Sequence, residues 1–506
     1  MGARDLFFPL QPPLQDSSSP RDEEPSEDLK KVLQWQDERL KRRLSGMYRS
    51  EVLLLSQLVN DNLKAPTRLS SIVVEGADHT RDSFLRFLTR PHLAREHETL
   101  EDVLHTGRYL SHLLQKSDVF SHVEARLEGA RDLLAGPHDV DLVLRTKERG
   151  RFFLKTATEL GNNEGSASMT ARVRNVFGGA EMFDANVSFG TKTRRAFTAS
   201  LTAPLTPDLD TSALLTAYGL QRDWTSFASC MEEQVGAKAA VRRGTPDVGA
   251  HELAYEGVVR HVGNLAPTAS IAMRQSAGQS SKSAVSYTYT FDSRDDRIAA
   301  TRGLYAKFAS EFAGVGGGDA RFLKTEAEAQ ASRRLTDHIS LSIASKTGLL
   351  YGLGNRPPLF PDKFRLGGPL SLRSFKASGM GPRDGPDHLG GDFYWSTGLS
   401  VVSDIPRRPQ WPVKLHGWVN AGRLDALELD APGQPDSKAP SLASQAPSLI
   451  SQLQSSFARP AVSVGLGLLY RFDPVRIELN FGVPLVASDS DATRKGLQVG
   501  MGLEFL

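Results

Sequence analysis

Histidine–acid pairs and a glycine-rich run are the features of this sequence that come nearest to enzymatic chemistry. His97-Glu98 and His251-Glu252 each lack the second histidine that a zinc-protease helix of the HExxH type needs to bind its metal. The glycine-rich residues 314–318 are not followed by the Lys-Ser or Lys-Thr pair of a phosphate-binding loop, and no GxSxG nucleophile elbow occurs. The sequence therefore predicts neither an enzyme nor a bound cofactor.

Charge and cysteine content exclude further classes of site. The chain has 61 Lys and Arg against 59 Asp and Glu, which lacks the basic excess typical of a nucleic-acid-binding protein. The single cysteine, Cys230, forms neither an internal disulfide nor a cysteine-rich metal site. The 12 histidines are scattered, and an isolated one such as His416 is expected to be structural. We predict no metal and no nucleic-acid partner.

One cluster of unusual composition remains, in Phe364–Phe375 (FRLGGPLSLRSF) followed by Leu389–Trp395 (LGGDFYW). Gly367 and Gly368, followed by a proline, predict a tightly folded loop. Physical reasoning alone favours an ordinary surface loop. The alternative is that Arg373 lies in a barrel lumen, where its guanidinium would hold the loop through several hydrogen bonds to inward-facing polar residues.

The elements that would position this loop show a period of two from about residue 150 onward. Val475–Val483 alternates apolar and polar residues, as do Leu497–Leu506 and Phe322–Ser332. A soluble sandwich would alternate too, but charged residues in mid-strand and connections that alternate short and long favour a membrane barrel. Asp473-Pro474 is a short connection, whereas Arg423–Ser456 is predicted to be a long loop. We expect a closed antiparallel barrel of about sixteen strands, each with its connection taking roughly 22 residues.

The barrel is preceded by two segments of different character. Residues 1–26 are rich in Pro, Ser and acids and are expected to be disordered. Ser26–Leu63 has the spacing of one or two amphipathic helices, which either pack on the next domain or bind a membrane surface. The sequence contains no run of about 18 apolar residues and no secretory signal. It also departs from the myristoylation pattern, because Leu6 stands where that pattern requires Ser or Thr.

The second segment, residues 66–148, predicts a compact α+β domain of order β-α-α-β-β. Its elements are a strand over Ser71–Gly76, a helix from Thr80 that Pro91 stops, a helix over Glu98–Lys116, and strands over Val119–Glu128 and Asp139–Thr146.

These features together resemble a known family. FRLGGPLSLRSF resembles the sixth-loop signature of the outer-membrane protein assembly superfamily (bacterial surface antigen family), whose members couple POTRA domains to a 16-stranded barrel. The β-α-α-β-β unit resembles one POTRA domain. The run from Ala458 to the end resembles the mitochondrial branch, the core barrels of the mitochondrial sorting and assembly machinery. So does Asn420-Ala421-Gly422, where bacterial relatives usually place Asp-Ala-Gly. The resemblance covers about residues 70–506.

The resemblance implies a domain order of 1–65 (disordered segment and amphipathic helix), 66–148 (POTRA-like domain) and 149–506 (transmembrane antiparallel β-barrel). It implies that the chain folds and inserts β-barrel precursor proteins into the mitochondrial outer membrane, with the POTRA-like domain in the intermembrane space. Its partners would be precursor polypeptides, accessory subunits of the assembly complex and membrane lipid. Precursors would enter at a lateral seam between the first and last strands, and folding itself would supply the energy.

The same resemblance identifies the site residues of the loop. They are Gly367, Gly368, Arg373 and Phe375, with Asn420 as a possible partner of the loop. Because Asn420 is neutral, a salt bridge of Arg373 is not assured. The chain departs from the family's Arg-Gly-Phe at Ser374, whose Cβ stands where glycine permits a positive φ. We therefore expect a slightly different bend at the loop tip.

The seam is predicted between Arg151–Leu160 and the last strand, Leu497–Phe505. Gly500 and Gly502 leave that strand short of side chains and predict weak closure. The last strand also fits the mitochondrial sorting signal, with Gln498, Gly500, Leu503 and Phe505 in its polar, glycine and hydrophobic positions; many barrel strands fit so loose a pattern, and the terminal position adds weight. Near the seam we expect lumenal Arg476, Glu478, Asn480 and Glu504 and lipid-facing Ile477, Leu479, Leu503 and Phe505.

Two rival functions stay open. One is a protein-translocation channel of the same superfamily, as in plastid or bacterial secretion, although a single POTRA-like unit without a secretory signal weighs against bacteria. The other is a passive metabolite pore, which the soluble domain and the sixth-loop motif disfavour.

Overall fold

The computed structural model describes residues 27–44, 56–93, 99–132, 134–161, 164–297, 300–354, 357–369, 371–408, 411–427, 442–472 and 475–502. The predicted disorder of residues 1–26 lies outside these ranges. The N-terminal amphipathic pattern forms α1, Glu27–Leu44, and a helical turn over residues 56–61. Large apolar side chains of α1, including Leu33 and Trp35, are exposed.

A three-stranded sheet of order β1-β3-β2 follows, with two helices in the β-α-α-β-β order that the sequence predicts. Helix α3 buries Phe84, Leu85 and Leu88. It does not stop at Pro91 as expected but includes it, because a proline in the last turn removes only one intrahelical hydrogen bond. The elements are β1 (Arg68–Glu75), α3 (Asp82–Leu93), α4 (Leu100–Lys116), β2 (Phe120–Gly129) and β3 (Asp139–Glu148).

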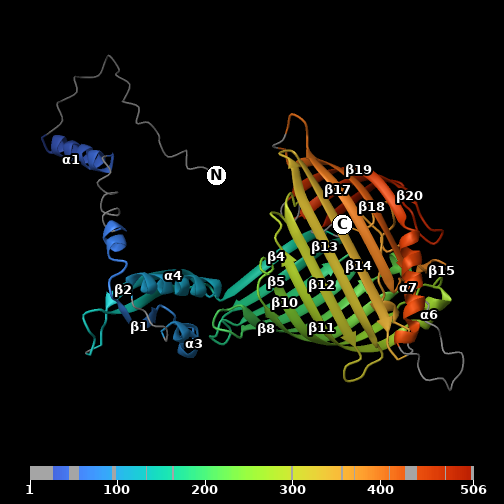
Figure 1. The fold of residues 1–506 in the computed structure, drawn as a ribbon, viewed down its shortest axis with the longest axis horizontal. Helices are drawn as coiled ribbons and strands as arrows, with labels where there is room; N and C mark the ends of the chain where they lie inside the picture. The colour runs from blue at the N-terminus through green and yellow to red at the C-terminus, as the bar shows by residue number, and fades with distance from the viewer. Residues whose placement is uncertain are drawn as a thin grey trace, which may run out of the picture. The chain divides into compact units, whose positions relative to one another are not determined.

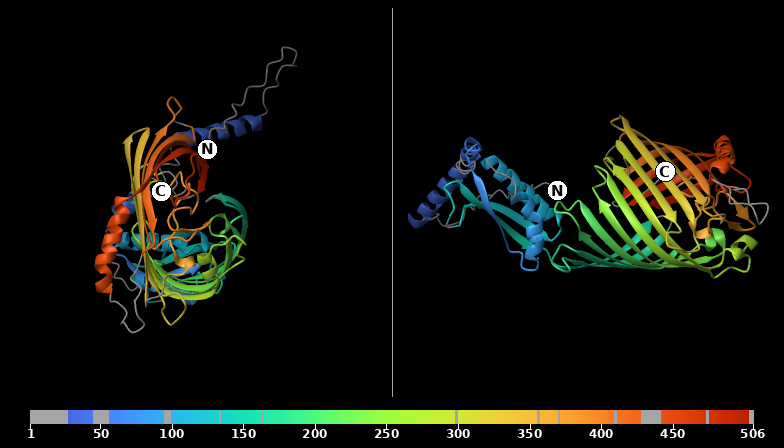
Figure 2. Two further views of the ribbon diagram at one scale, coloured as in Figure 1. Left: turned by 90° about the vertical axis from the view of Figure 1, so that its right-hand side faces the viewer. Right: turned by 60° about the horizontal axis from the view of Figure 1, so that its bottom comes forward.

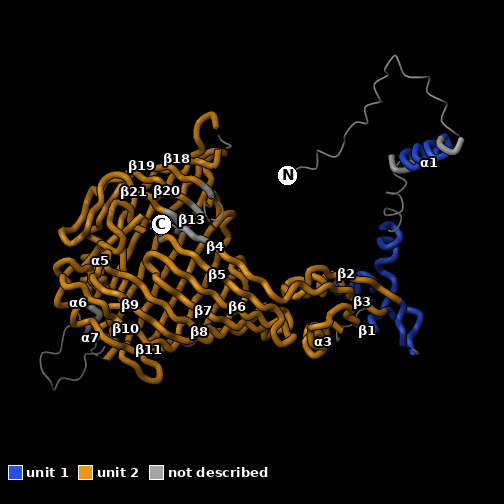
Figure 3. The backbone as a smooth tube through the Cα atoms, turned by 180° about the vertical axis from the view of Figure 1, so that it is seen from behind, with its two compact units in different colours: residues 1–70, 96–106, 129–140 blue, residues 71–95, 107–128, 141–506 orange. Residues whose placement is uncertain are grey.

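The chain divides into two compact units, each made of several segments of the sequence. One comprises residues 1–70, 96–106 and 129–140, and the other comprises residues 71–95, 107–128 and 141–506 (Figure 3). Most of the three-stranded sheet therefore clusters with the barrel. The domain boundaries at 65/66 and 148/149 stay a prediction.

Sixteen strands form one antiparallel sheet in sequence order, from β4 at one end to β21 at the other (Figure 1). This confirms the fold class and strand number predicted from the period of two. The strands are β4 (Phe152–Gly161), β5 (Glu164–Arg174), β6 (Met182–Gly190), β7 (Thr193–Pro204), β8 (Thr211–Asp223), β9 (Met231–Arg243), β10 (Ala250–Gly263), β11 (Gly278–Asp292), β12 (Gly303–Ala313), β13 (Phe322–Thr336), β14 (Ile339–Gly352), β17 (Phe393–Asp404), β18 (Val413–Asp425), β19 (Ala461–Phe472), β20 (Val475–Val486) and β21 (Gly496–Gly502).

Alternate side chains of the last two strands face opposite sides of the sheet. Leu479 and Val499 are 40% and 44% exposed, whereas their neighbours Glu478 and Gln498 are 0% and 4% exposed. Asn480 is buried on the same inner face. This agrees with the expected register, because a shift by one residue would exchange the two faces. The side chain of Arg476 and residues 503–506, with Leu503, Glu504 and Phe505, lie outside what the structure describes.

The sequence wrongly predicts that helices end at residue 150. Short helices α5 (Thr225–Ala228) and α6 (Ile271–Gln275) lie in two connections, and α7 (Leu442–Ala458) occupies the stretch predicted to be a long loop. Leu449, Leu453 and Phe457 have helical spacing, which the Ser- and Pro-rich composition masked. Phe457 stacks on Trp395 of β17, with ring centroids 5.2 Å apart, so α7 lies beside the barrel wall (Figure 2).

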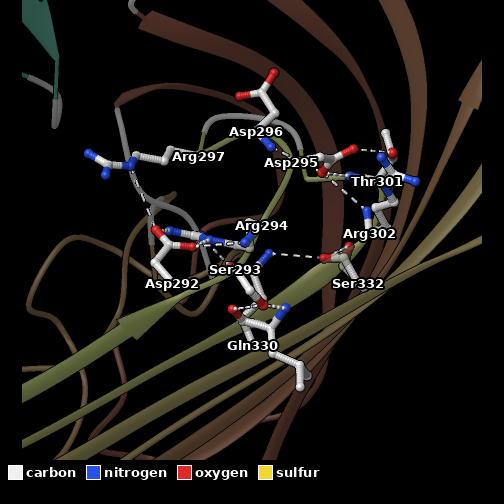
Figure 4. A network of polar contacts seen from close by, with 12 residues as sticks. Asp292, Ser293, Arg294, Asp295, Asp296, Arg297, Thr301, Arg302, Gln330 and Ser332 are labelled. Carbon is white, nitrogen blue, oxygen red and sulfur yellow. Dashed lines mark hydrogen bonds and ion pairs between the residues drawn. The ribbon is translucent and has the colours of Figure 1, made fainter. Parts of the chain in front are cut away.

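Hydrogen bonds of charged side chains hold the connection from β11 to β12 in its conformation (Figure 4). Arg294 donates to both carboxylate oxygens of Asp292 and, at 2.8 Å, to Oε1 of Gln330 on β13. Asp295 accepts hydrogen bonds from Thr301 and from the backbone N–H of Arg302. These contacts hold the connection to the inner face of β13.

Candidate functional site

The Arg373 motif lies in the connection between β14 and β17, residues 353–392, on the side where β4 ends. Counted along the chain it is the sixth connection on that side. It contains the 3-10 turn η1 (Phe360–Asp362) and a small hairpin of β15 (Arg383–Asp384) with β16 (Asp387–His388). A view along the barrel shows it within the ring of strands (Figure 2, left). We call residues 360–365 the loop root and residues 371–376 the loop tip.

Two glycines turn the chain between root and tip. Gly367 and Gly368 have φ of +106° and +116°, values that residues with a Cβ rarely adopt. A Cβ on Gly367 would also lie 2.6 Å from the carbonyl oxygen of Lys376. The N–H of Gly368 donates to the carbonyl of Leu372 at 3.1 Å, which closes the turn. Both glycines are therefore required by the shape of the loop.

Arg373 is held by a carboxylate that the sequence did not pair with it. Its side chain is fully buried, and Nε and Nη2 donate to Oε2 of Glu478 on β20 at 3.1 and 3.0 Å. Nδ2 of Asn480 donates to the same carboxylate at 2.7 Å. The guanidinium carbon lies 5.5 Å from the ring centroid of Trp418. A planar cation that meets a carboxylate and an aromatic ring in this way is fixed in direction as well as position.

Asn420 contacts the loop, but not as the partner of the guanidinium that the sequence suggested. Its Nδ2 donates to the carbonyl oxygen of Ser371 at 3.0 Å. The sequence predicted Glu478 to face the lumen without linking it to Arg373, because the two are 105 residues apart. The available signal was that Glu478 is an acid on the inner face of the last hairpin, where few other anionic partners exist.

The residues after Arg373 attach the tip to the last strand. Ser374 has a φ of +68°, so it adopts a left-handed conformation that is strained for a residue with a Cβ and free of that strain for glycine. Its N–H donates to Oε1 of Gln498 at 2.9 Å, and Nε2 of Gln498 donates to the carbonyl of Phe375 at 3.3 Å. Phe375 is fully buried. The N–H of Lys376 also donates to Ala492, in the connection before β21, at 2.8 Å.

Glycines on the inner face of the last three strands make room for this tip. A Cβ on Gly482 would overlap the hydroxyl of Ser374, and a Cβ on Gly465 would overlap the ring of Trp418. Gly500 stands opposite Glu478 in the register of β20 and β21, and so places no side chain beside the carboxylate. We call the inner-face residues that hold the tip the tip seat: Trp418, Asn420, Ser463, Glu478, Asn480 and Gln498.

The two ends of the sheet differ from its interior. In the residues described, no ladder of hydrogen bonds joins β4 to β21, although the two strands are neighbours. The tip thus contacts, through Gln498, a strand whose other edge is the end of the sheet. Of the predicted sorting-signal residues, Gln498 and Gly500 lie in β21, and Leu503 and Phe505 fall outside the described residues.

No group of three His, Cys, Asp or Glu residues within the described ranges is arranged to hold a metal ion. Likewise, none of the described helices is long and apolar enough to cross a membrane. The contacts that hold the loop tip are hydrogen bonds and the buried ion pair of Arg373 with Glu478.

Comparison with protein families and known structures agrees with this geometry. Residues 175–505 match the Omp85 superfamily domain. A SAM50-like protein of Schizosaccharomyces pombe is 32% identical over 461 residues, which cover 89% of this chain and 94% of that one. Sorting and assembly machinery component 50 homolog B of Xenopus laevis is 31% identical over 422 residues, 82% of this chain and 83% of that one.

A solved structure shares the fold. BamA from Haemophilus ducreyi lacking POTRA domains 1–3 superposes with a TM-score of 0.70 over 86% of this chain and 84% of that one. At 16% identity the similarity concerns the fold alone.

Proposed function

The chain belongs to the Omp85 superfamily and to its SAM50 homologues, and we propose that it folds β-barrel precursors and inserts them into the mitochondrial outer membrane. The relatives' name, sorting and assembly machinery component, supports accessory subunits as further partners. The POTRA-like domain would face the intermembrane space, where precursors arrive. No enzymatic step is part of this proposal.

The observation that carries the proposal is the contact between the sixth loop and the last strand. The loop tip bonds to Gln498 on β21, whose outer edge is not joined to β4 by a ladder in the described residues. An unpaired strand edge is costly in lipid, because its N–H and C=O groups have no water to bond. A precursor strand relieves that cost by adding to the edge, as in β-augmentation. The loop tip, bonded to the tip seat, then holds the receiving edge in place.

A reversible crosslink across the seam tests this mechanism. One cysteine is placed in residues 152–160 and one in residues 497–502, scanning for pairs that oxidise fully, in a Cys230→Ser background. Insertion of a radiolabelled barrel precursor into isolated mitochondria should stop when the pair is oxidised and resume on reduction. Two cysteines placed across β13 and β14 provide the control, because that ladder stays paired in either state.

The outcome separates the proposal from its rivals. Normal insertion through a fully crosslinked seam would remove the mechanism and the function together. A passive pore predicts that the crosslink leaves ion conduction of the purified barrel unchanged and that precursor insertion never depended on this chain. A translocation channel predicts that the crosslinked protein still passes a polypeptide across the membrane.

A further inference from the structure

The root of the sixth loop, like its tip, is attached to the barrel by a buried ion pair, through contacts that the proposed function does not use. Arg260 on β10 donates from Nη1 and Nη2 to the two carboxylate oxygens of Asp362, at 2.6 and 3.0 Å. The two side chains are 3% and 5% exposed. Nζ of Lys324 on β13 donates to the carbonyl of Asp362 at 3.1 Å. A bidentate, buried ion pair of this kind fixes the position and orientation of the loop root.

A second cation, Arg365, is part of the root and attaches it to the connection between β8 and β9. Its guanidinium carbon lies 3.6 Å from the ring centroid of Trp224 and 4.8 Å from that of Phe360. Its Nη2 donates to the carbonyl of Phe360 at 3.3 Å. Burial lowers the pKa of Arg365 to about 10, which keeps the side chain charged at neutral pH. Trp224 belongs to the connection between β8 and β9, so this contact holds the root to that wall of the barrel.

The hairpin that follows the tip reaches the same wall. A carboxylate oxygen of Asp387 accepts from the N–H of Ser270 at 2.8 Å, and one of Asp384 accepts from the N–H of Ala272 at 3.1 Å. Both N–H groups are at the start of α6, between β10 and β11. The part of the barrel formed by β8 to β11 and their connections therefore contacts the loop twice, at the root and again after the tip.

The root and the tip contact opposite walls of the barrel. In the order of sixteen strands, β10 is the seventh and β20 the fifteenth, eight steps apart in either direction. In a sixteen-stranded barrel, strands half the circumference apart face one another across the lumen. The stretch between Asp362 and Arg373 thus connects one ion pair on each side.

We infer that the sixth loop is a cross-brace, and that Arg260, Asp362 and Arg365 are positioning residues which hold the tip against the last two strands. The inference rests on the proposed function, since it concerns how the tip is kept on the receiving edge. Each wall strand at the root is paired on both sides, whereas β21 is at the end of the sheet. A load on the tip, such as a precursor pairing with β21, is therefore transmitted to a part of the barrel that does not open.

The test uses two readouts, one of which is independent of precursors. A Cβ on Gly379, just after the tip, would lie 3.1 Å from the Cβ of Ala492, so the two positions need to separate by only a few tenths of an ångström to reach the roughly 3.5–4.5 Å of a disulfide. The pair Gly379→Cys and Ala492→Cys, in a Cys230→Ser full-length chain in mitochondria, reports by its oxidation rate whether the tip is docked. Precursor insertion is measured in the same root variants without the cysteine pair.

Asp362→Asn should slow both oxidation and insertion by about two- to thirtyfold, the range seen for residues that couple distant sites. The charge-exchanged chain, Arg260→Asp with Asp362→Arg, should restore most of both rates, because it rebuilds the pair with its direction reversed. A merely structural role would lower barrel abundance in proportion to insertion, and abundance is measured on the same samples.

The outcomes are distinguishable. Oxidation at the wild-type rate in Asp362→Asn overturns the cross-brace, whatever happens to insertion. Slow oxidation with normal insertion supports the cross-brace and contradicts the proposed role of the tip. If Asp362→Asn fails to accumulate, Arg365→Lys decides, since lysine keeps the charge but loses the planar contact with Trp224. In that variant, too, an unchanged oxidation rate would overturn the inference.

Discussion

The loop root and the loop tip are both held by a buried arginine–carboxylate pair, yet they are attached to different kinds of strand. The root pairs Asp362 with Arg260 on β10, which has hydrogen-bonded neighbours on both sides. The tip pairs Arg373 with Glu478 on β20 and bonds to Gln498 on β21, the end of the sheet. The carboxylate belongs to the loop at the root and to the barrel at the tip.

The contacts around the two pairs also differ in kind. The root adds packing against rings and a lysine bond, without any backbone in a left-handed conformation at residues 360–365. The tip has Ser374 at φ +68° and a bed of glycines beneath it. Strained backbone persists where the surroundings hold it in place, and such places are common at functional sites. The comparison teaches that the root is anchored to fully paired strands by an unstrained backbone, whereas the tip meets the end of the sheet through a strained turn.

The largest effect is expected from removing the cation of the tip. Arg373→Ala leaves Glu478 buried without its counter-charge, a loss of about 3–5 kcal/mol for breaking a buried pair. Insertion of a radiolabelled precursor into mitochondria should fall further than the abundance of the barrel, because β20 keeps its neighbours on both sides. Glu478→Gln in the Arg373→Ala chain should recover part of the loss by removing the unpaired charge. Insertion at the wild-type rate in Arg373→Ala would contradict a role for the tip.

Asn420→Asp is expected to have the next largest effect. It converts the residue to the acid that bacterial relatives usually carry, but here Nδ2 of Asn420 donates to the carbonyl of Ser371 and Arg373 is already paired with Glu478. A carboxylate would face that carbonyl oxygen without a donor, at a cost of about 1–3 kcal/mol. Oxidation of the Gly379→Cys and Ala492→Cys pair should slow. Asn420→Ala, which removes the donor without adding charge, should slow oxidation less than Asn420→Asp. If Asn420→Ala slowed oxidation more, the new aspartate would be forming an ion pair with Arg373.

Gln498→Leu is expected to act more weakly and separates two roles of this residue. It removes an acceptor from the N–H of Ser374 and a donor to the carbonyl of Phe375, each bond contributing about 0.5–1.5 kcal/mol. If Gln498 serves the tip, insertion of other precursors falls in barrels that are already assembled. If it serves as a sorting signal, assembly of the newly imported chain itself falls. Gln498→Glu keeps the acceptor and should be the milder variant in the first case.

The smallest effect is expected at Ser374. Ser374→Gly removes a left-handed strain of about 1–2 kcal/mol but adds freedom to the unfolded chain, so the net change in stability should lie within about 1 kcal/mol of zero. Its hydroxyl finds no hydrogen-bond partner among the described residues, so nothing is lost with it. Precursor insertion should be unchanged. Ser374→Val should impair insertion, because valine resists a positive φ and Gly482 leaves room for a small side chain only.

Much of the barrel could be predicted from the sequence because a strand's period is local. Alternation along Val475–Val483 is enough to place Glu478 and Asn480 inside and Leu479 outside, whatever the neighbouring strand. Likewise, the glycines of the sixth loop predict a tight turn, and Arg373 is a side chain that can donate several hydrogen bonds at once. The local errors concerned helices: α3 continues through Pro91, α5 and α6 lie in two connections, and serine and proline concealed the helical spacing of apolar residues in α7.

The sequence by itself thus determined the strand pattern, the inner and outer faces and the loop that carries the arginine. Only the tertiary structure decided which carboxylate meets which guanidinium, because Arg373 and Glu478 are 105 residues apart and Arg260 and Asp362 are 102 apart. Those pairings depend on how many strands lie between the partners and on the closure of the sheet, which brings β10 and β20 face to face. The period and the composition of a strand do not show which distant strand will face it, because each describes a single strand at a time.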